Sequence, residues 1–120
     1  MRKYDLKDRT KYFAIRVLKE VGAIRKTYES VIVVKQMIRS VTSVASNYRA
    51  ACNARSDKEF FAKLCIVVEE ADESLFWLEI IEAMGWLPNQ VIDELMNESH
   101  QLVKIFNSSK YTIKQKLNKE

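Results

Sequence analysis

The sequence predicts an all-α protein, an antiparallel up-down-up-down four-helix bundle. Its 120 residues contain only two glycines and one proline, fewer than the turns of β-sheet proteins and Rossmann-type folds usually need. Apolar residues recur every three or four positions through four successive segments, which is the spacing of amphipathic helices. The connections between these segments are short, so each helix is expected to run antiparallel to the one before it.

The length and composition fit one globular domain over residues 1–120. Hydrophobic residues make up 48% and charged residues 30%, which excludes a disordered chain. The chain is charged from its second residue and has no run of about 18 apolar residues, so we expect neither a signal peptide nor a membrane helix. These features predict a cytoplasmic protein.

The first two helices are expected over about residues 6–26 and 30–54. Asp5 or Asp8 can cap the first one, and its apolar stripe is Phe13, Val17, Val21 and Ile24. The second helix begins with β-branched residues that could also form a strand, but its apolar seam continues for some 20 residues at helical spacing. That seam is Val34, Met37, Val41, Val44, Tyr48 and Ala51.

The third and fourth helices are expected over about residues 57–84 and 88–116. Ser56 and Glu59 form a capping box that opens the third helix, and Gly85 is placed to end it in a left-handed conformation. Its seam is Phe61, Leu64, Val68, Ala71, Leu75 and Leu78. Pro88 suits the first turn of the fourth helix, whose apolar residues are Val91, Leu95, Leu102, Ile105 and Phe106.

Polar residues flank the seam between the second and third helices. An antiparallel hairpin that turns near residues 55–56 places Arg39 beside Asp72 or Glu73, and it places Thr42 and Ser43 beside Glu69. One interpretation is a partly buried network that fixes the register of the hairpin. Its predicted members are Arg39, Thr42, Ser43, Asn47, Glu69, Asp72 and Glu73.

The alternative interpretation is a magnesium site. The run Glu69-Glu70-x-x-Glu73 resembles the EExxE element of all-α nucleoside triphosphate pyrophosphohydrolases, which also need an ExxD pair on the next helix. Here that pair is Glu94 and Asn97, and the neutral asparagine weakens a site for a hard cation. The one histidine, His100, lacks the spacing of a di-iron site. We therefore expect no catalytic residue, no metal ligand and no cofactor, and a protein that is not an enzyme.

Positive charge is concentrated in the first half of the chain. Residues 1–56 carry a net charge of +9 and residues 57–86 a net charge of −6. A basic segment can bind the phosphates of RNA by Coulomb attraction and counterion release. The candidates for such contacts are Arg2, Lys3, Lys7, Arg9, Lys11, Arg16 and Lys19. Arg9 and Arg16 are seven residues apart, so they share a helix face.

The adjacent aromatic residues Phe76 and Trp77 predict self-association. Neighbours in a helix point about 100° apart, so both cannot face the core of one bundle. A helix that is apolar on more than one side is typical of an assembly. We therefore expect one of these two side chains to contact another subunit.

Three runs together resemble a known family: residues 36–52, residues 61–64 and residues 69–79. They are similar to the small proteins encoded by intervening sequences of bacterial 23S rRNA genes, and Phe13-Ala14 fits the same pattern. The resemblance covers about residues 8–106. It does not extend to Ala50, where some members keep a glutamate.

This resemblance implies a single four-helix bundle that assembles into a ring-like homopentamer. A relative in diversity-generating retroelements contacts a reverse transcriptase and RNA through a basic surface. The resemblance therefore implies a non-enzymatic scaffold that binds RNA or a nucleic-acid-processing protein. The lack of a long apolar run adds the expectation of no membrane partner.

Overall fold

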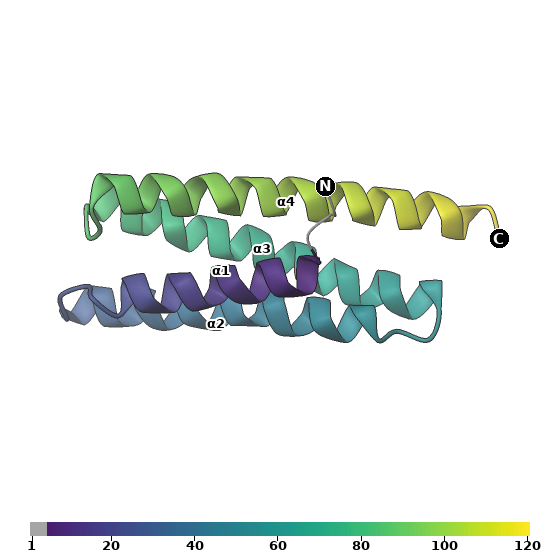
Figure 1. The fold of residues 1–120 in the computed structure, drawn as a ribbon, viewed down its shortest axis with the longest axis horizontal. Helices are drawn as coiled ribbons and strands as arrows, with labels where there is room; N and C mark the ends of the chain where they lie inside the picture. The colour runs from purple at the N-terminus through teal and green to yellow at the C-terminus, as the bar shows by residue number, and fades with distance from the viewer. Residues whose placement is uncertain (1–4) are drawn as a thin grey trace.

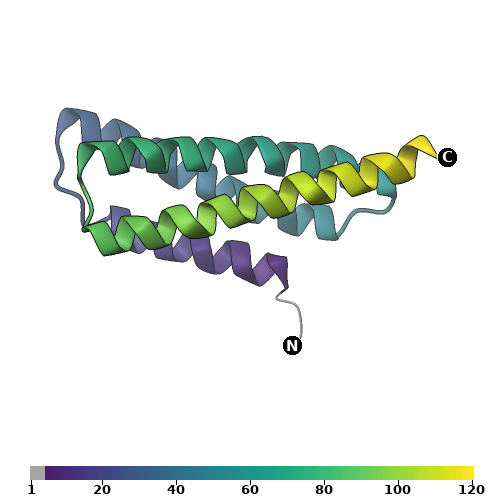
Figure 2. The same ribbon diagram turned by 90° about the horizontal axis from the view of Figure 1, so that it is seen from above.

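The structure is a computed structural model that describes residues 5–120, and in this range it contains four α-helices and no β-strand. They are α1 (Leu6–Val21), α2 (Tyr28–Cys52), α3 (Asp57–Met84) and α4 (Asn89–Asn118). Each helix runs opposite to the one before it (Figure 1). The view from above shows α4 crossing the other helices obliquely (Figure 2). The prediction of an all-α four-helix bundle is confirmed.

Three predicted helix ends have the expected geometry. Asp5 caps α1 by accepting a hydrogen bond from the backbone N–H two residues on, at 2.9 Å. Ser56 caps α3 by accepting from the N–H of Glu59 at 3.1 Å. Glu59 in turn accepts from the N–H of Arg55 at 3.3 Å. In a regular capping box it would accept from the N–H of Ser56. Gly85 ends α3 with φ of 69°, a left-handed conformation that glycine adopts without strain.

The turn between α1 and α2 differs from the expected one. α1 ends at Val21 instead of continuing to about residue 26, and α2 begins two residues earlier than expected. Thr27 and Ser30 form a reciprocal capping box at the start of α2. The Ser30 hydroxyl also donates to the carbonyl oxygen of Arg25 at 2.7 Å. Because these hydroxyls satisfy backbone groups of the turn, the turn is stable without a longer α1.

The predicted apolar stripes supply the core. All four residues of the first predicted stripe are buried, although Ile24 lies in the turn after α1. The other helices contribute large side chains with almost no exposed surface: Met37, Val41, Leu64, Leu78, Leu95 and Phe106. Each helix also buries at least one hydroxyl side chain, including Thr10, Ser40, Ser74 and Ser99. The Thr10 and Ser74 hydroxyls donate to the carbonyl oxygen one turn earlier, at 2.8 and 2.9 Å. Bonding within the helix lets these groups enter an apolar core without remaining unsatisfied.

The four helices are not equally close to one another. α2 packs closely on α1 and α3, and α3 packs closely on α4, whereas α1 and α4 come near each other at few positions. α1 is also the shortest helix, and its first residue lies beside the middle of α4, beyond which α4 continues (Figure 1). Lys116, near the end of α4, forms an ion pair at 2.9 Å with Asp57 at the start of α3. Over residues 5–120, no helix is both long enough and apolar enough to cross a membrane.

Candidate binding surfaces

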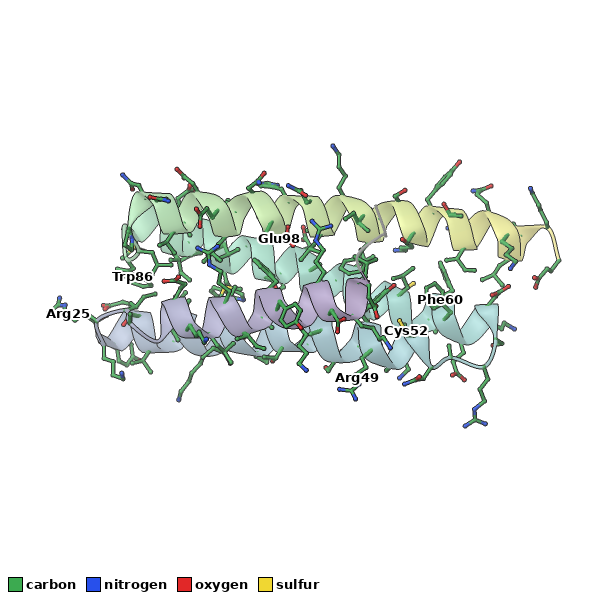
Figure 3. All side chains as sticks on the ribbon, in the orientation of Figure 1. Arg25, Arg49, Cys52, Phe60, Trp86 and Glu98 are labelled. Atoms are coloured by element: carbon green, nitrogen blue, oxygen red, sulfur yellow. The ribbon has the colours of Figure 1, made fainter. Side chains whose placement is uncertain are left out.

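The side of α1 that faces α4 carries the two predicted arginines. Arg9 donates to both carboxylate oxygens of Glu98, at 2.7 and 2.8 Å, and to Gln101 at 3.0 Å. Arg16 donates to Glu94 at 2.5 Å, and this bond holds the pKa of the Glu94 carboxyl below its ordinary value. Figure 3 shows Glu98 on the side of α4 that faces α1. Arg9 and Arg16 do share a helix face, but both form ion pairs with acids of α4.

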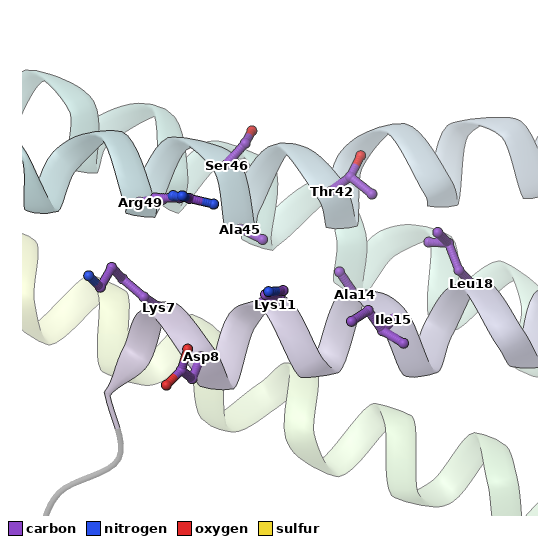
Figure 4. A pocket seen from close by; sticks show the side chains of 10 residues that line it. All are labelled: Lys7, Asp8, Lys11, Ala14, Ile15, Leu18, Thr42, Ala45, Ser46 and Arg49. Carbon is purple, nitrogen blue, oxygen red and sulfur yellow. The ribbon is translucent and has the colours of Figure 1, made fainter.

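The side of α1 that faces α2 carries lysines that have no such partner. Lys7 and Lys11 lie one turn apart, and Arg49 of α2 joins them at the edge of a groove of about 510 Å³ (Figure 4). Within residues 5–120, none of these three side chains forms an ion pair. Three cations therefore line one hollow of the surface without being neutralised by the fold.

The walls of this groove are mainly aliphatic. Ala14 and Ala45 lie toward each other between the two helices, and their small side chains leave the space that Ile15 and Leu18 border (Figure 4). The hydroxyls of Thr42 and Ser46 belong to the α2 edge, and no aromatic side chain of residues 5–120 lines the groove. Asp8 also borders it, but its carboxylate lies on the side of α1 away from α2 (Figure 4). The groove thus combines an apolar floor with cationic edges.

Three predicted phosphate contacts lie away from the groove or outside the described residues. Lys19 is exposed and forms no ion pair within the described part of the chain, while Arg2 and Lys3 lie outside the described residues. Arg49 is not among the phosphate contacts predicted from the sequence, which all lie in α1 or before it. The antiparallel pairing of α1 with α2 brings the end of α2 toward the start of α1. This pairing could have pointed to Arg49 as a neighbour of the first lysines of α1.

The predicted contact of Arg39 with α3 is present. Arg39 binds the carboxylates of Glu73 and Glu70, the latter at 3.3 Å. The indole N–H of Trp77 donates to Glu73 at 3.1 Å. The hydrogen bonds from Trp77 and Arg39 together hold the pKa of Glu73 below its ordinary value. The second carboxylate is Glu70 and not Asp72, which is exposed.

The rest of the predicted polar network does not cross the hairpin. Thr42 donates to the carbonyl oxygen of Ile38 at 2.7 Å, and Asn47 donates to the carbonyl oxygen of Ser43 at 2.9 Å. Short polar side chains in a helix often bond to the carbonyl one turn earlier, and these bonds compete with contacts to another helix. Glu69 is exposed. The Arg39 side chain keeps 47% of its surface exposed, so the network is a surface ion cluster and not a buried one.

The acids of the alternative magnesium site lie on different sides of the bundle. Glu70 and Glu73 contact Arg39 of α2, whereas Glu94 contacts Arg16 of α1. Over residues 5–120, no group of three or more His, Cys, Asp or Glu side chains is placed to hold a metal ion. The arrangement therefore does not support the pyrophosphohydrolase interpretation.

Charge is strongly segregated along the bundle. Residues 64–103, which form most of α3 and the first half of α4, contain nine Asp or Glu and no Lys or Arg. The end at which α2 turns into α3 is basic, because residues 104–120 of α4 carry five lysines and one glutamate. Arg55 and Lys58 belong to the same end, since the Lys116–Asp57 ion pair joins it to α4. One end of the molecule is thus cationic, and the α3–α4 hairpin at the other end is anionic.

Comparison with known proteins identifies the family. The family model described as 23S rRNA-intervening sequence protein matches residues 2–108. The chain is similar to a solved structure of a protein with unknown function from the S23 ribosomal protein family of Bacteroides thetaiotaomicron. The two share 29% identity and superpose with a TM-score of 0.77, over 88% of this chain and 98% of that one. No curated protein matches the chain in sequence. Since the family model covers most of its length, the chain belongs to the 23S rRNA-intervening sequence protein family.

Proposed function

We propose that this protein acts by binding and not by catalysis, as a homo-oligomeric four-helix bundle that associates with RNA. The observation that carries the proposal is the basic end of the bundle. Its cations are exposed or half-exposed and form no ion pair within residues 5–120: Arg55, Lys58, Lys110, Lys114 and Lys119. A cluster of unpaired cations attracts phosphates and releases their counterions on binding.

The basic end suits RNA better than the face of α1 does. The arginines of α1 are held by Glu94 and Glu98, and its groove lysines border aliphatic walls. At the basic end, the Lys116–Asp57 contact keeps the last turns of α4 beside the start of α3, so cations from two helices point into solvent together. Cations from two helices that lie at one end of the bundle can contact neighbouring phosphates of the same strand.

Self-association supports the same function. Phe76 keeps 48% of its surface exposed on the outer side of α3, which fits a helix that is apolar on more than one side. The family resemblance implies a ring of five copies. A ring would present several basic ends at once, and multivalent contacts strengthen RNA binding without any new interaction.

Fluorescence anisotropy with labelled RNA tests the proposal. Wild type should bind with an affinity that falls steeply between about 50 and 200 mM salt. Lys58→Glu with Lys114→Glu should weaken binding at least tenfold and should lower the salt slope by about 1 for each phosphate that the protein no longer neutralises. The matched control is Lys19→Glu with Lys35→Glu, which makes the same charge change away from the basic end and should have a smaller effect.

Either of two results would contradict RNA binding at this end. One is an affinity for RNA that does not depend on salt, and the other is an equal loss in the control variant. Purification of the protein with a bound protein partner and no RNA would instead favour a protein scaffold.

A further inference from the structure

We propose that the groove between α1 and α2 is the docking site for α3 of a second copy of this chain, with Phe76 of that copy entering the groove. The inference rests on the homo-oligomer of the proposed function and names the two surfaces that meet. RNA binding at the basic end plays no part in it.

The groove has the chemistry of a receptor for an apolar side chain surrounded by acids. Its floor is formed by the small residues Ala14 and Ala45, and its volume of about 510 Å³ is ample for an aromatic ring. The edges carry Lys7, Lys11 and Arg49, which have no ion-pair partner among residues 5–120. Unpaired cations around an apolar hollow favour an anionic surface that presents a large apolar group.

The outer face of α3 has the complementary pattern. Glu69, Asp72, Phe76 and Glu79 follow one another at spacings of three, four and three, so they share one helix face. The three acids are exposed and form no ion pair with any described residue. Phe76 is half-exposed between them. Three unpaired acids around an aromatic ring on α3 thus match three unpaired cations around the groove.

A contact within α3 favours one orientation of Phe76 before any partner arrives. Its ring packs edge-on against Trp77, with centroids 4.9 Å apart. Trp77 is itself held by the hydrogen bond from its indole N–H to Glu73, which also binds Arg39. A side chain that is already ordered loses little entropy on insertion, and aromatic residues that fill pockets dominate the energy of many interfaces.

The two surfaces lie on different sides of one molecule, since one is between α1 and α2 and the other is on the outside of α3. A contact between them is therefore heterologous: it leaves a free groove on one copy and a free α3 face on the other. Repetition of this contact gives a closed ring or a filament. Two variants, each defective in one of the surfaces, should together form only a dimer.

The experiment measures molar mass by light scattering in the absence of RNA. Ala45→Phe fills the groove and leaves the α3 face intact, and Phe76→Ser removes the inserted ring and leaves the groove intact. Each variant alone should be monomeric where wild type is oligomeric. An equimolar mixture should form a one-to-one dimer and nothing larger, because only one productive interface remains.

Two further variants keep the test decisive. Tyr12→Ser removes another exposed aromatic side chain, one that lies on the α1–α4 side, and should keep the wild-type mass. Ala45 packs partly against the core, so circular dichroism should first check the fold of Ala45→Phe. If that variant is unfolded, Lys11→Glu with Arg49→Glu replaces it, and the same one-to-one dimer is expected with Phe76→Ser.

The outcomes separate this inference from the proposed function. A wild-type monomer at all concentrations would overturn the homo-oligomer itself and this interface with it. An oligomer whose mass survives both variants would overturn only the assignment of the two surfaces. Variants that each dimerise alone would point to contacts between identical surfaces of two copies, and a mixture that stays monomeric would show that the groove does not bind the α3 face; either result would overturn the heterologous interface.

Discussion

The two sides of α1 hold that helix in place in different ways. Toward α2 the helices pack closely, and the lysines at the edge of the groove form no ion pair with any of residues 5–120. Toward α4 there are few close approaches, and arginines cross the gap to Glu94 and Glu98. The same helix thus packs most closely against α2, and ion pairs are added to its contacts with α4. The comparison separates the two contributions within a single element.

General magnitudes indicate which side contributes more to stability. Full burial of an aliphatic side chain contributes roughly 1.5–3 kcal/mol, whereas an exposed ion pair contributes about 0–1 kcal/mol. α1 buries Phe13, Val17 and Val21 in the core. We therefore expect packing to hold α1 in the bundle, with the ion pairs mainly setting its position relative to α4.

The largest effect is expected for Val17→Ala. The Val17 side chain has no exposed surface, and the truncation removes two methyl groups and leaves a cavity. The free energy of unfolding should fall by about 2–3 kcal/mol, measured by urea denaturation followed by circular dichroism. A loss smaller than that of either arginine variant described next would reverse the ranking of the two sides.

A smaller effect is expected for the arginines. Arg9 binds Glu98 through two hydrogen bonds, and both side chains are less than a third exposed, so Arg9→Met should cost about 1–2 kcal/mol. Arg16 is 43% exposed, and Arg16→Met should cost less than about 0.5 kcal/mol. The controls Lys7→Gln and Lys11→Gln should leave the stability unchanged, because neither lysine has an ion-pair partner in residues 5–120. Equal costs for the four variants would show that the pairing seen across α1 and α4 has no energetic weight.

The smallest expected effect is on the titration of the Glu94 carboxyl at acidic pH. The hydrogen bond from Arg16 holds the pKa of Glu94 below its ordinary value of 4.5. A carboxyl with a lowered pKa in the folded state stabilises that state above the ordinary value, and the contribution is lost as the pH falls through the folded-state value. An NMR titration of the Glu94 side chain should give a midpoint below 4.5, and Arg16→Gln should move it upward. An unchanged midpoint in this variant would show that Arg16 does not cause the lowered pKa of Glu94.

Helical spacing was enough to predict most of the fold. The stripes in α1, α2 and α3 are periodic, and each contains a fully buried residue: Val17, Met37 and Leu64. Local chemistry also predicted the cap at Ser56 and narrowed the cap of α1 to Asp5 or Asp8, of which Asp5 is the one used. The early end of α1 was missed, because the Thr27–Ser30 box and its bond to Arg25 depend on a turn conformation that periodicity does not describe.

The binding surfaces were predicted less well, for a geometric reason. Spacing along one helix tells which residues share a face, as for Arg9 and Arg16, but not which neighbouring helix that face meets. Similarly, the hairpin register predicted Arg39 beside Asp72 or Glu73. Arg39 contacts Glu73, and the register missed Glu70, since a long guanidinium reaches carboxylates on two turns. The groove depends on the pairing of Ala14 with Ala45, and no sequence motif marks two alanines on separate helices as a hollow.

The absence of Lys and Arg from residues 64–103 has a practical consequence for labelling and digestion. Trypsin has no cleavage site within this stretch, so complete digestion should release one peptide that runs from Leu64 to Lys104. Amine-reactive cross-linkers cannot attach to residues 64–103 at all, whereas carbodiimide can join their acids directly to lysines. A carbodiimide cross-link between this peptide and the peptide that contains Lys11, found in the oligomer and absent from the monomer, would therefore map the contact between copies without any mutation.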